Sequence, residues 1–334
     1  MQPAFPLVGN RLVQERLARA ADEDRLHHAY LFEGPEGVGK ATFALWLAKY
    51  VNCESGQRPC GACRSCRLMA SGAHPDLILV GADPERATRI ISVDQAHALI
   101  SALQLQRHSG KRRFVILDPA DILNEDAANS LLKTLEEPPR GTQFVLVTAR
   151  VASLLPTIRS RCQRIRFGPV PAAEFAAWLQ SRVISPEIGR AAGGSPGLAI
   201  RLHGGEAEAR AHARDAMLDA IGQPLHRLFA FTEAEGKKDE GVSRAEGVVD
   251  LLEELLRDCA CLRANRGDRL VHADRRETLD AWSLALWPGG IARLATGIAN
   301  ARDRLKLNVN GRTGLETLLA QLNLELTARP TEIR

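Results

Sequence analysis

A glycine-rich loop between a strand segment and a helical segment limits the possible folds of this chain more than any other feature. Residues 29–32 (AYLF) are predicted to form a buried strand and residues 42–51 a helix, and the loop between them contains Gly-Lys. In this order, glycines let backbone N–H groups surround phosphate oxygens, and the lysine reaches the terminal phosphates. The sequence therefore predicts a phosphate loop, with the candidate nucleotide-binding residues Gly34, Gly37, Gly39, Lys40 and Thr42.

The residue after the lysine departs from a complete phosphate-binding motif. That position usually carries Ser or Thr, whose hydroxyl binds Mg²⁺, whereas this chain has Ala41. Thr42 comes next, but one further residue along a helix is rotated by about 100°, so its hydroxyl points elsewhere. The loop is thus compatible with binding ATP and Mg²⁺ as cofactors, and poorly equipped for hydrolysis. A glycine turn that binds nothing is the plainer alternative.

Short apolar runs alternate with helical stretches in the first half of the chain. Beyond the first strand, such runs occur at 76–80, 113–117 and 143–148, which is typical of a parallel sheet covered by helices. The run at 113–117 leads into Asp118, where a carboxylate can support Mg²⁺, and then into Pro119, which cannot act as a base. An aspartate that caps a turn before a proline is the alternative explanation of Asp118.

The strand signals stop in the second half of the chain. Residues 172–202 are predicted to form several short helices, one of them capped by Ser195 with Pro196 in its first turn. Leu, Ala and Arg then repeat with helical periodicity. With 334 residues, the chain exceeds the usual size of one core. We therefore expect an α/β domain followed by all-α domains, with the divisions 1–168, 169–205 and 206–334.

Four of the seven cysteines are close together, with the spacing C-x₆-C-x₂-C-x₂-C. Residues 1–9 do not show the pattern of a secretory leader, so we expect a reducing compartment, where an odd number of cysteines with such a cluster is typical of a metal site. Four thiolates suit one tetrahedral zinc ion with no open position, so we expect a structural metal. Unconnected thiols and an iron–sulfur cluster are the alternatives. The predicted zinc ligands are Cys53, Cys60, Cys63 and Cys66.

Charge and hydropathy exclude few functions. The formal net charge of +4 is compatible with a protein that works near DNA, but it is too small to indicate direct contact. Basic residues at 111–113 and at Arg159, Arg164 and Arg166 could add positive charge near DNA, although charged residues at strand ends are usually solvated. No apolar run is long enough to span a bilayer, so we expect a cytoplasmic protein that does not enter a membrane.

Several longer motifs occur together in an order that resembles the bacterial clamp-loader ATPase family. They are the phosphate loop, the four-cysteine insert, and the stretches HHAYLF at 27–32, NSLLKTLEEPP at 129–139 and SRC at 160–162. The match covers roughly residues 7–205, and the last two stretches are much more specific than the phosphate loop. The resemblance implies an N-terminal AAA+ domain, a three-helix lid domain and a C-terminal helical collar domain, in a ring that loads the sliding clamp onto primed DNA.

Three departures from the motor subunits of that family favour its delta-prime branch. The gamma/tau motors are similar at the zinc insert but carry Thr in place of Ala41, an acidic residue in place of Pro119 and an arginine in place of Gly197. The resemblance therefore implies a ring subunit that assembles with gamma/tau and delta subunits and hydrolyses little or no ATP. Such a subunit reaches the clamp and DNA through the complex, as part of a holoenzyme with DNA polymerase activity.

Arg161 in the SRC stretch corresponds to the arginine finger that members of this family offer to ATP on the adjacent subunit. A guanidinium stays protonated and can bind two phosphate oxygens, so it stabilises the charge of the transition state. Without the resemblance, a surface or ion-paired arginine is the simpler interpretation. Thr148 corresponds to the sensor-1 position, although a threonine at a strand end is often only a turn residue.

The sequence leaves two other functions open. One is an active gamma/tau-type motor, which brisk ATP turnover by the purified chain would indicate. The other is a free-standing zinc and nucleotide-binding protein that acts on DNA by itself, which failure to assemble with gamma/tau and delta would indicate.

Overall fold

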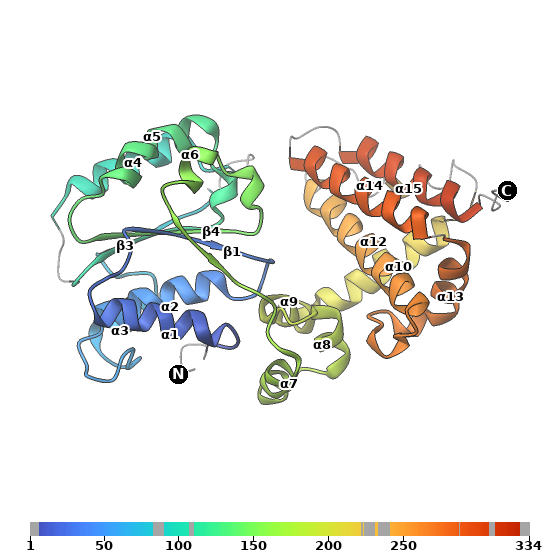
Figure 1. The fold of residues 1–334 in the computed structure, drawn as a ribbon, viewed down its shortest axis with the longest axis horizontal. Helices are drawn as coiled ribbons and strands as arrows, with labels where there is room; N and C mark the ends of the chain where they lie inside the picture. Colours follow the sequence, from blue (N-terminus) through green and yellow to red (C-terminus); the bar gives the residue numbers. More distant parts are fainter. Residues whose placement is uncertain are drawn as a thin grey trace. The chain divides into compact units, whose positions relative to one another are not determined.

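The computed structural model describes residues 7–82, 90–106, 110–221, 223, 231–232, 241–286, 288–306 and 311–327. The chain divides into two compact units (Figure 1). The first comprises Met1–Ile184 and Ala192–Ile200, and the second comprises Ser185–Ala191 and Arg201–Arg334. Each unit encloses buried apolar residues of its own.

The first unit alternates strands with helices. Its strands are β1 (Ala29–Glu33), β2 (Leu77–Val80), β3 (Arg113–Leu117), β4 (Thr142–Thr148) and β5 (Gln163–Arg166). Its helices are α1 (Arg11–Asp22), α2 (Lys40–Asn52), α3 (Arg64–Ala70), α4 (Val93–Gln104), α5 (Glu125–Glu136), α6 (Pro156–Arg159), α7 (Ala172–Ser181) and α9 (Pro196–Arg201, its last residue in the second unit). The short 3₁₀ turns η1 (Ala120–Ile122) and η2 (Val151–Ser153) follow β3 and β4.

The five strands form one parallel sheet in the order β2-β3-β4-β1-β5. In the register, Leu31 of β1 pairs with Leu146 of β4 on one side and with Arg164 of β5 on the other. Because all strands run in the same direction, their carboxyl ends meet at one edge of the sheet and their amino ends at the opposite edge. The phosphate loop follows the carboxyl end of β1, whereas the SRC stretch comes directly before the amino end of β5.

Helices cover both faces of this sheet (Figure 1). Alternate strand residues point to opposite faces, so Phe32 belongs to the core formed with α1, α2 and α3, whereas Leu31 belongs to the core formed with α4, α5 and α6. Phe43 of α2 and Leu131 of α5 are almost wholly buried in these two cores. Burial on both faces explains why the central strands appear in the sequence as nearly continuous apolar runs.

The predicted parallel α/β sheet is confirmed, and four of its five strands match the apolar runs of the sequence. The fifth strand, β5, was not predicted, because its sequence QRIR contains no apolar run. It lies at the edge of the sheet and exposes three of its four residues. Charged residues on an edge strand discourage pairing with another chain. Because β5 carries such residues, it cannot be recognised from a pattern of apolar residues.

The second unit is helical, with no strand among its described residues. Its elements are α8 (Pro186–Ala192, its last residue in the first unit), the π-helical turn η3 (Leu202–Glu206), α10 (Ala207–Ala220), α12 (Gly241–Arg263), η4 (Gly267–Arg269), η5 (Ala273–Arg275), α13 (Arg276–Ala285), α14 (Pro288–Lys306) and α15 (Gly311–Thr327). Helix α12 packs against α13, α14 and α15, and Leu252 and Leu255 are fully buried there. None of the described helices is long and apolar enough to cross a membrane.

The short helices predicted for residues 172–202 are present as α7, α8 and α9. Ser195 caps α9, because its Oγ accepts the N–H of Leu198 at 3.3 Å, and Pro196 is the first residue of that helix. Helices α7 and α9 belong to the first unit, whereas most of α8 belongs to the second. The division into domains at residues 168 and 205 therefore stays a prediction.

Candidate functional site

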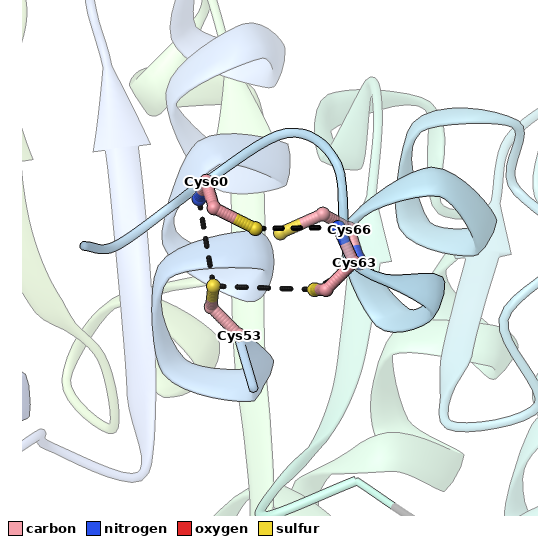
Figure 2. A group of neighbouring side chains, drawn as sticks. All are labelled: Cys53, Cys60, Cys63 and Cys66. Carbon is pink, nitrogen blue, oxygen red and sulfur yellow. Dashed lines mark hydrogen bonds between the residues drawn. The ribbon is translucent and has the colours of Figure 1, made fainter. Parts of the chain in front are cut away.

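Four cysteine side chains converge where helix α2 ends and helix α3 begins (Figure 2). Cys53 directly follows α2, Cys63 is the N-cap of α3, and Cys66 lies in the first turn of α3. Cys60 comes from the intervening loop, where Gly61 has a φ of 70° and lets the backbone turn toward Cys63. The four sulfur atoms lie within 4.8 Å of one another.

Backbone N–H groups point at these sulfur atoms. Those of Ser55 and Cys60 both donate to the Cys53 sulfur at 3.4 Å. The N–H of Cys63 donates to the Cys60 sulfur at 3.3 Å, and the N–H of Cys66 donates to the Cys63 sulfur at 3.4 Å. Backbone hydrogen bonds, first that from Cys63, lower the pKa of Cys60 to about 6, whereas burial raises the pKa of Cys66 to about 12. The backbone of the loop thus favours a thiolate at Cys60, whereas burial favours the neutral thiol at Cys66.

The sulfur positions fit a single tetrahedral ion. With metal–sulfur bonds of about 2.3 Å, the sulfurs of a tetrahedral site lie roughly 3.8 Å apart. The sulfur atoms of Cys53 and Cys63 are 4.0 Å apart, close to that separation. An iron–sulfur cluster spaces its cysteine sulfurs farther apart, because each of them binds a different iron atom. The donor set can therefore hold one metal ion and fits a cluster poorly.

The loop between the first two cysteines is also tied to helix α1. Arg58 donates to Asp22 at 2.8 Å, and its guanidinium lies 5.0 Å from the centre of the Tyr50 ring. The Tyr50 hydroxyl donates to the same carboxylate, at 3.0 Å from each oxygen. Beside it in α2, Lys49 is buried, and burial lowers its pKa while the neighbouring Cys66 sulfur opposes that shift. The cysteine loop thus connects two helices of one face of the sheet.

The lysine of the phosphate loop is bound within the chain. Lys40 Nζ donates to the carbonyl oxygens of Gly34 at 2.7 Å and Pro35 at 2.6 Å. Burial lowers the pKa of Lys40, and the carboxylates of Asp118 and Glu36 oppose this shift. Two of the three N–H groups of the ammonium are therefore taken by main-chain oxygens of the loop that would otherwise surround a phosphate.

Residues 195–198 lie against the phosphate loop. The N–H of Gly197 donates to the carbonyl of Gly37 at 2.8 Å, and the hydroxyl of Ser195 donates to the carbonyl of Glu36 at 3.0 Å. A Cβ atom on Gly197 would lie 2.9 Å from the Cα of Gly37, a distance that Cβ atoms do not adopt. Gly197 therefore does more than lack an arginine side chain, because its backbone packs on the loop itself.

Asp118, after β3, and Thr148, at the end of β4, differ in whether their polar groups are available to a ligand. Asp118 is exposed at the surface, yet desolvation of its carboxyl group raises its pKa while the Lys40 ammonium opposes that rise. Thr148 is fully buried, and its hydroxyl donates to Asp121 at 2.7 Å and accepts the N–H of Arg150 at 2.8 Å. A hydroxyl has one hydrogen, so Thr148 has none left for a phosphate.

The remaining residues of the predicted nucleotide site are open. Thr42 is exposed on the first turn of α2, and no atom lies within 4 Å of a Cβ placed on Gly39 among the described residues. Sequence reasoning assigned no role to Asp121, which also accepts Arg150 Nε at 2.7 Å. Its position three residues after Asp118 was the only available signal.

Arg161 lies at the opposite edge of the sheet from the phosphate loop. It comes directly before β5, whose first residue Gln163 pairs with Tyr30 near the amino end of β1. The phosphate loop follows the carboxyl end of β1, and the five residues of that strand span about 16 Å at ~3.3 Å per residue. The Arg161 side chain therefore cannot reach the phosphate loop of its own chain.

The guanidinium of Arg161 is held by two partners. Its Nε donates to Glu136 Oε1 at 2.7 Å, and its Nη2 contacts the same oxygen. Its Nη1 donates to the carbonyl of Thr157 at 2.7 Å. Sequence reasoning did not single out Glu136, although it belongs to the LLKTLEEPP stretch, because nothing local relates it to a residue 25 positions away.

Several of the other basic residues are paired within the chain. Arg113 is buried, and its terminal nitrogens donate to carbonyls at and beyond the end of α4. It caps a helix and is not a surface charge for DNA. Arg164 and Arg166 both donate to the buried carboxylate of Glu33 at 2.8 Å, so they compensate a buried charge at the sheet edge.

Comparisons of the sequence with known proteins point to one family. The family model described as "DNA polymerase III, delta subunit" matches residues 9–171. The chain is 32% identical over 325 residues to DNA polymerase III subunit delta' of Bacillus subtilis, in an alignment that covers 93% of this chain and 95% of the relative. It is also 32% identical over 275 residues to DNA polymerase III subunit tau of Escherichia coli, which covers 75% of this chain and 42% of tau. Among solved structures, a DNA polymerase III gamma subunit-related protein of Thermotoga maritima is similar with a TM-score of 0.45 and 18% identity, over 93% of this chain and 99% of that one.

The extent of these alignments distinguishes the relatives. The match to the Bacillus protein runs along nearly the whole of both chains, whereas the match to tau leaves more than half of tau uncovered. The matched family segment contains the phosphate loop, the four cysteines and the SRC stretch. The chain therefore belongs to the delta-prime family of bacterial DNA polymerase III clamp-loader subunits.

Proposed function

We propose that this chain completes an ATP site on a neighbouring clamp-loader subunit and hydrolyses little or no ATP itself. The observation that carries the proposal is the placement of Arg161 and the phosphate loop at opposite edges of one parallel sheet. An arginine that cannot reach its own phosphate loop is suited to a phosphate bound by another subunit.

The phosphate loop of the chain itself lacks what hydrolysis needs. Ala41 has no oxygen for Mg²⁺, and Pro119 stands where a water-polarising carboxylate is needed. The ammonium of Lys40 is bound to carbonyls of the loop, and the hydroxyl hydrogen of Thr148 is bound to Asp121. These contacts support a loop that serves the fold rather than turnover.

Arg161 brings the chemistry that a phosphoryl-transfer site requires from outside. Its guanidinium stays protonated and can donate to two oxygens of one phosphate, which stabilises the charge that develops in the transition state. Such arginines accelerate nucleotide hydrolysis by about 10³–10⁵. In this proposal Arg161 is the one residue of the chain that touches a reacting nucleotide.

The metal site has a structural part in the same proposal. Zinc held by Cys53, Cys60, Cys63 and Cys66 has four protein ligands, so no position is open for a substrate. The N–H groups that point at the sulfurs spread the charge of the thiolates. We assign zinc the task of joining helices α2 and α3.

The partners follow from the relatives and belong to the proposal. The chain assembles with gamma/tau and delta subunits, and through that complex it acts on the sliding clamp and primed DNA. An active motor of the gamma/tau type is the competing function, since tau is also a relative.

Reconstitution tests the proposal directly. Gamma/tau and delta subunits are combined with and without this chain, and DNA-dependent ATPase and clamp loading are measured. We expect both activities to rise when the chain is present, and the purified chain with Mg²⁺ to show no turnover. Brisk turnover by the purified chain that disappears in Lys40→Ala would establish the motor instead, and failure to join the complex would contradict both.

A further inference from the structure

The contact between Arg161 and Glu136 determines how much of the guanidinium stays available. A guanidinium has five N–H groups, one on Nε and two on each terminal nitrogen. Glu136 takes the Nε hydrogen and one Nη2 hydrogen, and the Thr157 carbonyl takes one Nη1 hydrogen. One N–H remains on each terminal nitrogen, and no acceptor for either is found in the part of the chain that the structure describes.

Those two remaining N–H groups are the ones that a bidentate phosphate contact uses. One hydrogen from each terminal nitrogen gives the guanidinium two donors for two oxygens. An arginine free to rotate about its side-chain bonds would direct these two N–H groups toward a phosphate only part of the time. The contacts with Glu136 and Thr157 hold the guanidinium in one orientation and leave one N–H on each terminal nitrogen for an outside acceptor.

The groups that grip Arg161 are themselves well anchored. Glu136 is the last residue of α5, directly after Leu135, which is 1% exposed in the core beneath the helix. Thr157 belongs to α6, and its neighbour Ile158 is fully buried in the same core. The C-terminus of α5 also carries a partial negative charge that favours a cation there. The backbone on which each partner lies is therefore anchored in the core.

We infer that Glu136 is a positioning residue, which holds the Nε side of Arg161 so that its terminal N–H groups face a phosphate on the adjacent subunit. This inference rests on the proposed function of Arg161 in trans. Glu136 touches no nucleotide in this arrangement and acts only through Arg161. Its removal leaves the charge of the arginine intact but frees its orientation.

The complex reconstituted with gamma/tau and delta tests the inference. The measured quantity is the Arg161-dependent ATPase, that is, the part of the DNA-stimulated rate that Arg161→Ala removes. Glu136→Ala is expected to lower the kcat of that part about tenfold with KM for ATP changed less than twofold, because misplacing a catalytic group by about 1 Å costs up to ~100-fold. Glu136→Gln is expected to restore part of the loss, since its amide oxygen still accepts from Nε.

Two controls separate positioning from a general effect on folding or charge. Glu137→Gln removes a neighbouring exposed carboxylate and is expected to leave the rate unchanged. The double variant Glu136→Ala with Arg161→Ala is expected to be no slower than Arg161→Ala alone, because two residues that act as a unit are not additive. The melting temperature of each variant shows that the chain is folded.

The outcomes distinguish the inference from the proposed function. If Arg161→Ala lowers the ATPase and Glu136→Ala does not, the positioning role is wrong and the arginine finger stands. A rate that rises in Glu136→Ala would also overturn the inference, because Glu136 would then restrain the arginine rather than direct it. If Arg161→Ala itself changes nothing, the proposed function and the inference both fail.

Discussion

The two edges of the central sheet differ in whether their polar groups are already satisfied. At the carboxyl edge, Lys40 donates to the carbonyls of its own loop and the hydroxyl of Thr148 donates to Asp121. At the amino edge, Arg161 keeps one N–H on each terminal nitrogen beyond its contacts with Glu136 and Thr157. A parallel sheet separates its two edges by the length of its strands, so Lys40 and Thr148 can be paired within the chain without disturbing Arg161.

The largest expected effect comes from exchanging the two cations for alanine, one edge at a time. In the assembled complex, Arg161→Ala is expected to slow hydrolysis at the site it serves by about 10³, because the transition state loses a charged bidentate donor. Lys40→Ala is expected to leave that rate within about twofold, since Lys40 contacts only its own loop. DNA-stimulated ATPase measures both.

Arg161→Lys is the matched variant for charge, because it keeps the cation but lacks the fork of two donors. It is expected to behave nearly like Arg161→Ala. If Lys40→Ala abolished the ATPase and Arg161→Ala left it unchanged, the phosphate loop rather than Arg161 would be the part of this chain that supports hydrolysis.

The next largest effect is expected from removing the metal, which would destabilise the connection between α2 and α3. Cys63→Ser removes one ligand and is expected to abolish binding of one zinc ion per chain and to cost about 3 kcal/mol of stability, which lowers the melting temperature by roughly 6–12 °C. Zinc content and thermal unfolding are the measurements. Cys259→Ser changes a buried cysteine of the second unit and is expected to leave the zinc content unchanged.

Acidification gives a second check on the metal, since protons compete with zinc for thiolates. The stabilisation by zinc is therefore present near neutral pH and is expected to be lost as the pH falls. A chain purified under reducing conditions that contains no zinc and unfolds at the same temperature as Cys63→Ser would contradict a structural metal.

A smaller effect tests the packing of Gly197 on the phosphate loop at the carboxyl edge. Gly197→Ala places a Cβ 2.9 Å from Gly37 Cα and is expected to cost about 1–3 kcal/mol, because neither backbone can move freely. The melting temperature is expected to fall accordingly. Gly168→Ala is the control in the same unit, since no described atom lies within 4 Å of its Cβ. Equal melting temperatures for the two variants would mean that residues 195–198 do not stabilise the loop.

The smallest effect concerns the Thr148 hydroxyl. Thr148→Val keeps the shape of the side chain but leaves the N–H of Arg150 without its acceptor, at an expected cost of about 1–2 kcal/mol. The ATPase of the complex is expected to stay the same, because the hydroxyl serves Asp121 rather than a nucleotide. A drop in ATPase without loss of stability would restore Thr148 as a nucleotide sensor.

The parts of the fold that the sequence predicted are those determined by local pattern. Strands buried on both faces appear as apolar runs, so β1 to β4 were found, whereas the exposed edge strand β5 was not. The four cysteines converge as predicted, because their ligand spacing is contained within one loop and one helix turn. The cap of α9 by Ser195 was also predicted from two adjacent residues.

The hydrogen bonds at the two edges of the sheet could not be predicted from such local patterns. The phosphate loop sequence is the same whether Lys40 binds a nucleotide or the carbonyls of Gly34 and Pro35. The bond from Ser195 to Glu36 joins positions 159 residues apart, and the pair of Glu136 with Arg161 joins positions 25 apart. Pairings at such separations depend on how the strands are ordered in the sheet, which no single segment encodes.

The separation of the two edges also has a consequence for assembly. Subunits that place one edge against the opposite edge of the next make a head-to-tail contact, which by itself can repeat without limit. Under the proposed function, a chain that offers its amino edge but has no hydrolytic site at its carboxyl edge would behave like the end group of a polymer. On the proposed function, the chain would donate Arg161 to its neighbour's ATP site and add no hydrolytic site of its own, so it would mark one end of the series of ATP sites.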